Sequence, residues 1–127
     1  MTRDFYPARL KVYGKALDAV VAVESLTAML PRSWAPMSDQ LRRATLSIGG
    51  NITEGAMEFS PAEQKRFYRI AKRSAGECLF YLAAIHRLSL ATADQVRGFA
   101  KLLLEIISML TPMITRDEPN RKVRPGQ

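Results

Sequence analysis

The chain has 127 residues, a formal net charge of +7 and a mean hydropathy of −0.10. This length fits a single domain that buries roughly two-thirds of its unfolded surface, enough for a core without disulfides. Its only cysteine, Cys78, excludes an intramolecular disulfide and a cysteine-rich metal site. The first residues lack a signal peptide's apolar core, and the uncharged run over residues 78–85 is too short to span a bilayer. We therefore expect a cytoplasmic protein with no membrane contact, cofactor or metal.

No segment shows the alternating pattern of strands, so the sequence predicts an all-α protein. The first helix is expected over residues 8–30, because Pro7 suits a helix start and Pro31 stops the helix. A loop that contains Pro36 follows. The second helix is expected over residues 38–55, and it would end with Gly55 in the left-handed conformation. Its apolar stripe comprises Leu41, Ala44, Thr45, Ile48 and Ile52.

Capping signals begin the last two helices. Ser60 and Glu63 form a capping-box pattern with a proline between them, which predicts a helix over residues 61–89. A second capping box at Thr92 predicts a helix over residues 93–115.

Four such helices joined by short loops predict an antiparallel up-down-up-down four-helix bundle over residues 1–115. Pro112 is expected to kink or end the last helix. Residues 116–127 contain two prolines and few apolar side chains, so we expect a mobile basic tail.

The second helix also carries a polar stripe, formed by Gln40, Arg43, Ser47, Asn51 and Glu54. The stripe is either a solvated face or a buried polar seam. Gly49 and Gly50 in mid-helix favour burial slightly, since a close neighbouring backbone is a common reason for glycine there.

The third helix concentrates the basic charge. Residues 61–88 hold six basic and two acidic side chains, a net charge of +4. The core stripe is expected at Phe67, Ile70, Ala71, Ser74, Cys78, Tyr81 and Ile85. Away from that stripe lie Lys65, Arg66, Arg69, Lys72 and Arg73, with Tyr68 close by. Together with Arg121, Lys122 and Arg124 of the tail, they predict binding to phosphate backbones, with a merely solvated face as the alternative.

Apolar residues lie outside the expected core stripes of the last two helices. They are Leu79, Phe80, Leu102, Leu104 and Met109. We expect a homo-oligomer interface there, with incidental surface exposure as the alternative.

No pattern of residues supports catalysis. The only histidine, His86, lacks the glutamate three residues earlier that a di-iron bundle site requires. Cys78 lies on the apolar stripe, which favours a buried, unreactive thiol. Glu54 and Glu77 could face each other across the second and third helices, and a structural pairing with Arg43 or Arg73 is favoured over acid-base catalysis. We therefore expect no enzymatic activity.

Two segments are specific enough to indicate a family. Residues 47–55 read Ser-Ile-x-x-Asn-Ile-x-Glu-Gly and residues 71–77 read Ala-x-x-Ser-x-x-Glu. Over residues 5–115 the chain resembles the 23S ribosomal RNA intervening-sequence proteins. The resemblance implies a bundle that assembles into a ring or barrel, typically a homopentamer, with a basic surface and no established enzymatic activity. It assigns motif positions with structural roles to Gln40, Arg43, Ser47, Asn51, Glu54, Gly55, Ser74 and Glu77.

The same superfamily includes the accessory variability protein of diversity-generating retroelements, which partners a reverse transcriptase. Two hypotheses result. The first is a non-enzymatic, oligomeric bundle that binds RNA or DNA backbones electrostatically. The second is an accessory protein that binds a reverse transcriptase and contacts nucleic acid only in that complex.

Overall fold

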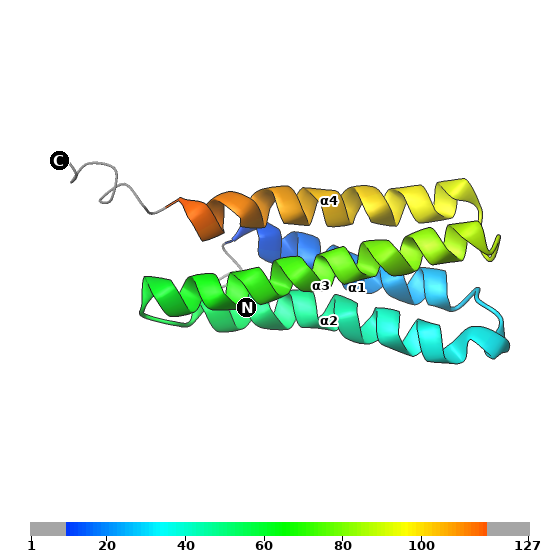
Figure 1. Cartoon of the computed structure of the whole chain (residues 1–127), viewed down its shortest axis with the longest axis horizontal. Coiled ribbons are helices and arrows are strands. Elements are labelled where there is room, and N and C mark those ends of the chain that lie inside the picture. The colour runs from blue at the N-terminus through cyan, green and yellow to red at the C-terminus, as the bar shows by residue number, and fades with distance from the viewer. Residues whose placement is uncertain (1–9, 117–127) are drawn as a thin grey trace.

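The computed structural model describes residues 10–116, which fold into four long α-helices. They are α1 (Lys11–Thr27), α2 (Ala35–Ala56), α3 (Pro61–Arg87) and α4 (Ala93–Thr115), with a short 3-10 turn, η3 (Arg32–Trp34), before α2. Each helix packs against the next, and α1 packs against α4 (Figure 1). The described residues contain no strand. The predicted all-α four-helix bundle is confirmed.

One apolar core joins all four helices. The predicted α2 stripe is buried throughout, from Leu41 to Ile52. The largest fully buried aliphatic side chains are Leu41, Ile48, Ile52, Leu82, Ile85, Leu103, Ile106 and Leu110. At roughly 1.5–3 kcal/mol for each large apolar side chain, their burial is the main force that holds the bundle together.

The first two helices differ from their predicted bounds. Leu10 is extended and precedes α1, so the helix begins at Lys11; Pro7 lies outside the described residues. Helix α2 begins at Ala35, three residues earlier than predicted. The reason is Pro36, which lies in the first turn, where its missing N–H costs nothing.

The last two helices follow their capping signals. Ser60 accepts a hydrogen bond from the Glu63 backbone N–H, and the Thr92 capping box is complete, with Thr92 and Gln95 each capping the other. Helix α3 ends two residues before the predicted bound, at Arg87. Helix α4 keeps the predicted bounds and continues through Pro112 to Thr115.

Gly55 has a different role from the predicted one. It lies inside α2, and no described glycine has a positive φ. A Cβ on Gly55 would lie 2.6 Å from Cε1 of Tyr68 and 3.1 Å from the backbone oxygen of Gln64. The absent side chain therefore makes room for the Tyr68 ring, so the prediction of a left-handed helix end at Gly55 is wrong.

The Tyr68 ring also corrects the predicted phase of α3. Tyr68 is buried at 7% exposure, whereas Phe67, Ile70 and Tyr81, expected in the core, are only half-buried. The buried stripe of α3 comprises Tyr68, Ala71, Ser74, Ala75, Cys78, Leu82 and Ile85. The apolar pattern of the sequence fits either Phe67 or Tyr68 in the core. Tyr68 takes that position because Gly55 leaves space for its ring.

Helix α4 is long and apolar enough, by length and composition alone, to cross a membrane. Core helices of helical bundles pass the same test. In this fold α4 buries Phe99, Leu103, Ile106 and Leu110 against the other helices.

Candidate nucleic-acid interface

The solvent-facing side of α3 carries most of the predicted phosphate-binding residues. Arg66, Arg69 and Arg73 are exposed, and Lys65 and Lys72 are half-buried. The side chains rise from a rigid 27-residue helix, so their spacing is fixed by helix geometry. We call this surface the outer α3 face and define it by Arg66, Arg69, Lys72, Arg73, Phe80 and Arg87.

The basic residues of this face differ in their contacts. Arg66 pairs with Glu63 at 3.0 Å, and its guanidinium lies 4.4 Å from the centre of the Phe67 ring. Within residues 10–116, Arg69, Lys72 and Arg73 form no ion pair. Phosphates can therefore approach these three cations without first displacing a carboxylate.

The aromatic residue expected beside these cations is not available to a ligand. Tyr68 is buried against Gly55 on the inner side of α3. Phe80, expected at a subunit interface, is an exposed aromatic on the outer α3 face, with 68% exposure, which is compatible with that expectation. The sequence contained a signal for this arrangement. A spacing of seven residues places side chains on one side of a helix, and it relates Arg66, Arg73, Phe80 and Arg87.

The family-motif residues form a polar contact between α2 and α3. The Ser47 and Ser74 hydroxyls lie 2.9 Å apart, and the Asn51 amide donates to the Ser47 hydroxyl at 3.0 Å and to its carbonyl at 2.8 Å. All three side chains are buried or half-buried. The polar stripe of α2 is thus a seam at its centre.

The remaining motif side chains lie at the surface. Gln40, Arg43, Glu54 and Glu77 are exposed. Within the described part of the chain neither glutamate forms an ion pair, so the expected pairing with arginines is wrong. Glu77 instead accepts a hydrogen bond from the Tyr81 hydroxyl at 3.2 Å.

Cys78 is buried on the inner side of α3, as predicted. Burial raises the pKa of its thiol from 9.0 to about 11, a change that Thr45, 3.5 Å from the sulfur, partly opposes and nearby Glu77 reinforces. A protonated, enclosed thiol is a poor nucleophile. Within residues 10–116 no group of three or more His, Cys, Asp or Glu residues could hold a metal ion.

The residues expected at an oligomer interface lie in two environments. Leu79, Leu102 and Met109 are half-buried and pack against the core of their own chain. Phe80 and Leu104 are exposed. The tail residues Arg121, Lys122 and Arg124 lie outside the described residues.

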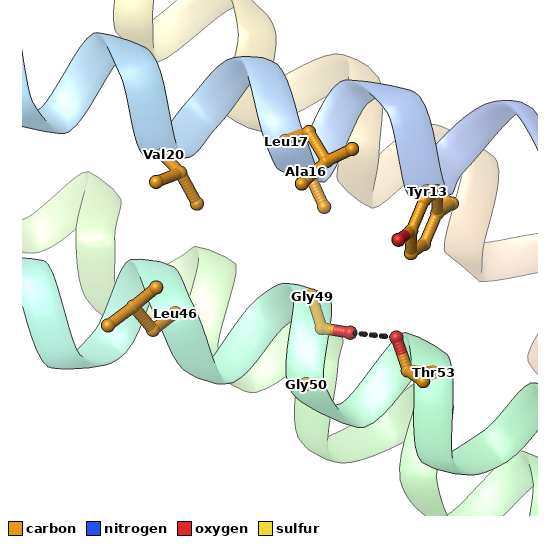
Figure 2. A pocket seen from close by; sticks show the side chains of 8 residues that line it. All are labelled: Tyr13, Ala16, Leu17, Val20, Leu46, Gly49, Gly50 and Thr53. Carbon is orange, nitrogen blue, oxygen red and sulfur yellow. Dashed lines mark hydrogen bonds between the residues drawn. The ribbon is translucent and has the colours of Figure 1, made fainter. Parts of the chain in front are cut away.

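Another apolar surface lies between α1 and α2 and was missed in the sequence. A groove of about 190 Å³ lies there. Figure 2 shows the residues that line it: Tyr13, Ala16, Leu17, Val20, Leu46, Gly49, Gly50 and Thr53. Leu17 and Leu46 are more than half exposed, and so is Val21 beside them. A Cβ on Gly49 would lie 3.5 Å from Ala16 Cβ, whereas Gly50 faces open space. The Gly49 contact is an ordinary van der Waals distance to a side chain, so the expected close approach of a backbone is found at neither glycine.

Comparisons with known proteins agree with the four-helix fold. The family model for the 23S rRNA-intervening sequence protein matches residues 8–112. A crystal structure described as a protein of unknown function from the S23 ribosomal protein family of Bacteroides thetaiotaomicron VPI-5482 is 28% identical, with a TM-score of 0.75. The match covers 81% of this chain and 94% of that one. No curated protein matches the chain.

Proposed function

The chain belongs to the 23S rRNA-intervening sequence protein family, and on that premise we propose that it is a non-enzymatic protein that binds RNA or DNA backbones through the outer α3 face. The observation that carries the proposal is the group Arg69, Lys72 and Arg73, three cations within five residues that form no ion pair within residues 10–116. Lys65, Arg66 and the tail residues Arg121, Lys122 and Arg124 extend the proposed surface.

Such a surface binds by releasing counterions from the nucleic acid, so its affinity depends on salt and little on sequence. Each phosphate contact to a single strand contributes about 0.7 to the slope of log affinity against log salt. Three contacts on this face thus account for a slope of about 2.

The test is fluorescence anisotropy of labelled RNA, single-stranded DNA and duplex DNA with the full chain, at low and near-physiological salt. In Arg69→Gln/Lys72→Gln/Arg73→Gln we expect weaker binding to all ligands and, for single strands, a salt slope smaller by about 2. The control, Lys11→Gln/Arg32→Gln/Arg116→Gln, removes the same charge from exposed positions on other elements. Equal losses in both variants, or no binding by the unaltered chain at low salt, would refute the proposal.

We also propose that the chain forms a homo-oligomer, a pentamer by family resemblance, and that the α1–α2 groove contributes to the subunit contact. The groove is apolar, and Val21 beside it is 69% exposed. Contiguous exposed apolar surface of this kind is typical of protein contacts.

Light scattering at micromolar concentration tests this assembly, because the protomer mass is 14.2 kDa. Leu17→Glu/Val21→Glu places two carboxylates beside the groove and should reduce the measured mass to that of the protomer. Leu104→Glu, on the face expected from the sequence, is the comparison variant. A mass near 14.2 kDa for the unaltered chain would contradict the proposal.

The same groove favours the second candidate function, an accessory protein that binds a reverse transcriptase. In that case the partner protein fills the groove, and nucleic acid contacts α3 only in the complex. A reverse-transcriptase gene beside the gene for this chain would support this alternative, whereas a location within a ribosomal RNA gene would oppose it.

A further inference from the structure

Phe80 lies between arginines on one side of α3. Arg66, Arg73, Phe80 and Arg87 recur every seven residues of α3, which places them along one line of the helix surface. Successive members of the row are about 10 Å apart, since each residue adds about 1.5 Å of rise. The phenyl ring therefore has an exposed guanidinium two helical turns away on either side.

The Phe80 side chain is 68% exposed. The positions one turn before and one turn after it are Gly76 and Ala83, both exposed, and a Cβ on Gly76 would meet nothing within 4 Å. Tyr81 packs edge-to-face against Phe80, with ring centres 5.8 Å apart. This contact covers part of the ring, and the exposed fraction of Phe80 leaves the rest in contact with solvent.

We propose that Phe80 stacks on an unpaired base of a single-stranded nucleic acid, with phosphates of that strand on Arg73 and Arg87. This inference rests on the proposed function and narrows it from nucleic acid in general to single strands. Stacking on an aromatic side chain needs a free base, and a duplex keeps its bases stacked on each other. A duplex can reach the cations but not Phe80.

The surroundings of Phe80 favour a nucleic acid over a second subunit. The centres of protein interfaces are depleted of charged residues. Phe80 lies among Arg73, Glu77 and Arg87, whereas the α1–α2 groove is lined without a single charged side chain. Glu77, one turn before Phe80, repels phosphate; its carboxylate accepts a hydrogen bond from the Tyr81 hydroxyl at 3.2 Å. The proposed phosphate contacts are therefore those with Arg73 and Arg87.

The test compares Phe80→Ala with the matched control Phe59→Ala on the full chain. Phe59 is a fully exposed phenylalanine in the α2–α3 loop, outside the helix that carries the arginines. Affinities are measured for a single-stranded RNA and for a duplex of the same sequence. We expect Phe80→Ala to weaken single-strand binding about tenfold, the effect of losing one base stack, and to change duplex binding less than twofold. Phe59→Ala should change neither.

Phe80→Trp gives a readout that a structural role would not produce. Its tryptophan emission should be quenched by the single strand and unchanged by the duplex, after subtraction of the signal from Trp34, the only native tryptophan. Unchanged single-strand affinity in Phe80→Ala, with loss in the Arg69/Lys72/Arg73 variant, would overturn the stacking inference and leave the proposed function intact. Equal loss of both ligands with a lower oligomer mass would assign Phe80 to a subunit contact. Absence of binding by the unaltered chain would overturn both proposals.

Discussion

The two sides of α3 have opposite chemistry within one helix. The outer α3 face presents arginines and an exposed phenyl ring to solvent. The inner side presents Tyr68 to Gly55, Ser74 to Ser47 and Cys78 to Thr45 of α2, all within contact distance. Residue type alone does not separate these roles, because each side contains an aromatic residue; the position around the helix decides which one contacts the core.

This contrast predicts a separation of effects. Changes on the outer side should alter binding and leave the free energy of unfolding unchanged. Changes on the inner side should alter stability and leave binding by the folded protein unchanged. A variant that changes both the binding affinity and the free energy of unfolding would contradict this separation between the two sides of α3.

The largest effect is expected on the outer side. Arg69→Gln/Lys72→Gln/Arg73→Gln should weaken single-strand binding roughly 50-fold at 0.15 M salt, since each lost phosphate contact removes about 0.7 of slope. The three side chains lie at the surface without ion pairs inside the described range, so we expect thermal unfolding to shift by less than about 2 °C. Circular dichroism melts beside the anisotropy titrations measure both; a large fall in Tm would show that the outer residues also stabilise the fold.

Gly55→Ala should have the largest effect on the inner side. Its Cβ would clash with Tyr68 and the Gln64 backbone, and overpacking of this kind costs about 2 kcal/mol, a fall in Tm of roughly 8 °C. Gly98→Ala is the matched control, because Gly98 is exposed in α4 with nothing within 4 Å of its Cβ. Gly98→Ala should stabilise by about 0.5–1 kcal/mol. A Gly55→Ala variant as stable as the parent would refute the close contact.

From the raised pKa of the Cys78 thiol we predict that the free energy of unfolding depends on pH. Its folded-state pKa is about 11 and its ordinary value is 9.0, so the protonated form is favoured by the fold. The associated stability is therefore fully present below pH 9 and is lost as pH rises from about 9 through about 11, by roughly 2–3 kcal/mol at most. Urea unfolding across this range should give a steeper decline for the parent than for Cys78→Ala, which lacks the titrating group. Parallel declines would contradict the burial of the thiol.

The smallest effect is expected from Ser74→Ala, which tests the hydrogen bond between Ser74 and Ser47. It removes the 2.9 Å hydrogen bond to Ser47, a loss of about 1 kcal/mol, while Asn51 still donates to Ser47. Denaturant unfolding should show this loss, with RNA affinity at the parent value. Ser47→Ala/Ser74→Ala should lose less than the sum of the single variants, because no unpaired hydroxyl remains.

Much of the fold was predictable because its signals are local. The Thr92 capping box gave the bounds of α4, and the spacing of the α2 apolar residues gave its buried face. The start of α2 was missed because Pro36 suits both a loop and a first helical turn. The family motif was visible in sequence, but the contact of Ser47 with Ser74 depends on how two helices meet in space.

The candidate site was predictable only in part. Clustered basic residues indicated the outer α3 face, whereas the choice between Phe67 and Tyr68 for the core depends on the space at Gly55, in another helix. Phe80 was recognised as lying outside the core, but its neighbours along the helix surface suggest a ligand other than a second subunit. The α1–α2 groove was missed because its residues come from two helices and none departs from an ordinary amphipathic pattern on its own.

The ion pair between Lys15 and Glu105, 3.0 Å long, links residues 90 positions apart in the chain. The other contacts between helices join elements that follow one another in the chain. Among the described helices, only α1 and α4 are in contact without being consecutive. Local helix pairs form quickly and distant contacts form late in folding. We therefore expect Glu105→Gln to accelerate unfolding and to leave the refolding rate nearly unchanged, which stopped-flow measurements across a denaturant series would show. On this expectation, closure of the bundle by its first and last helices governs how long a folded molecule persists, while the hairpins between them govern how fast it forms.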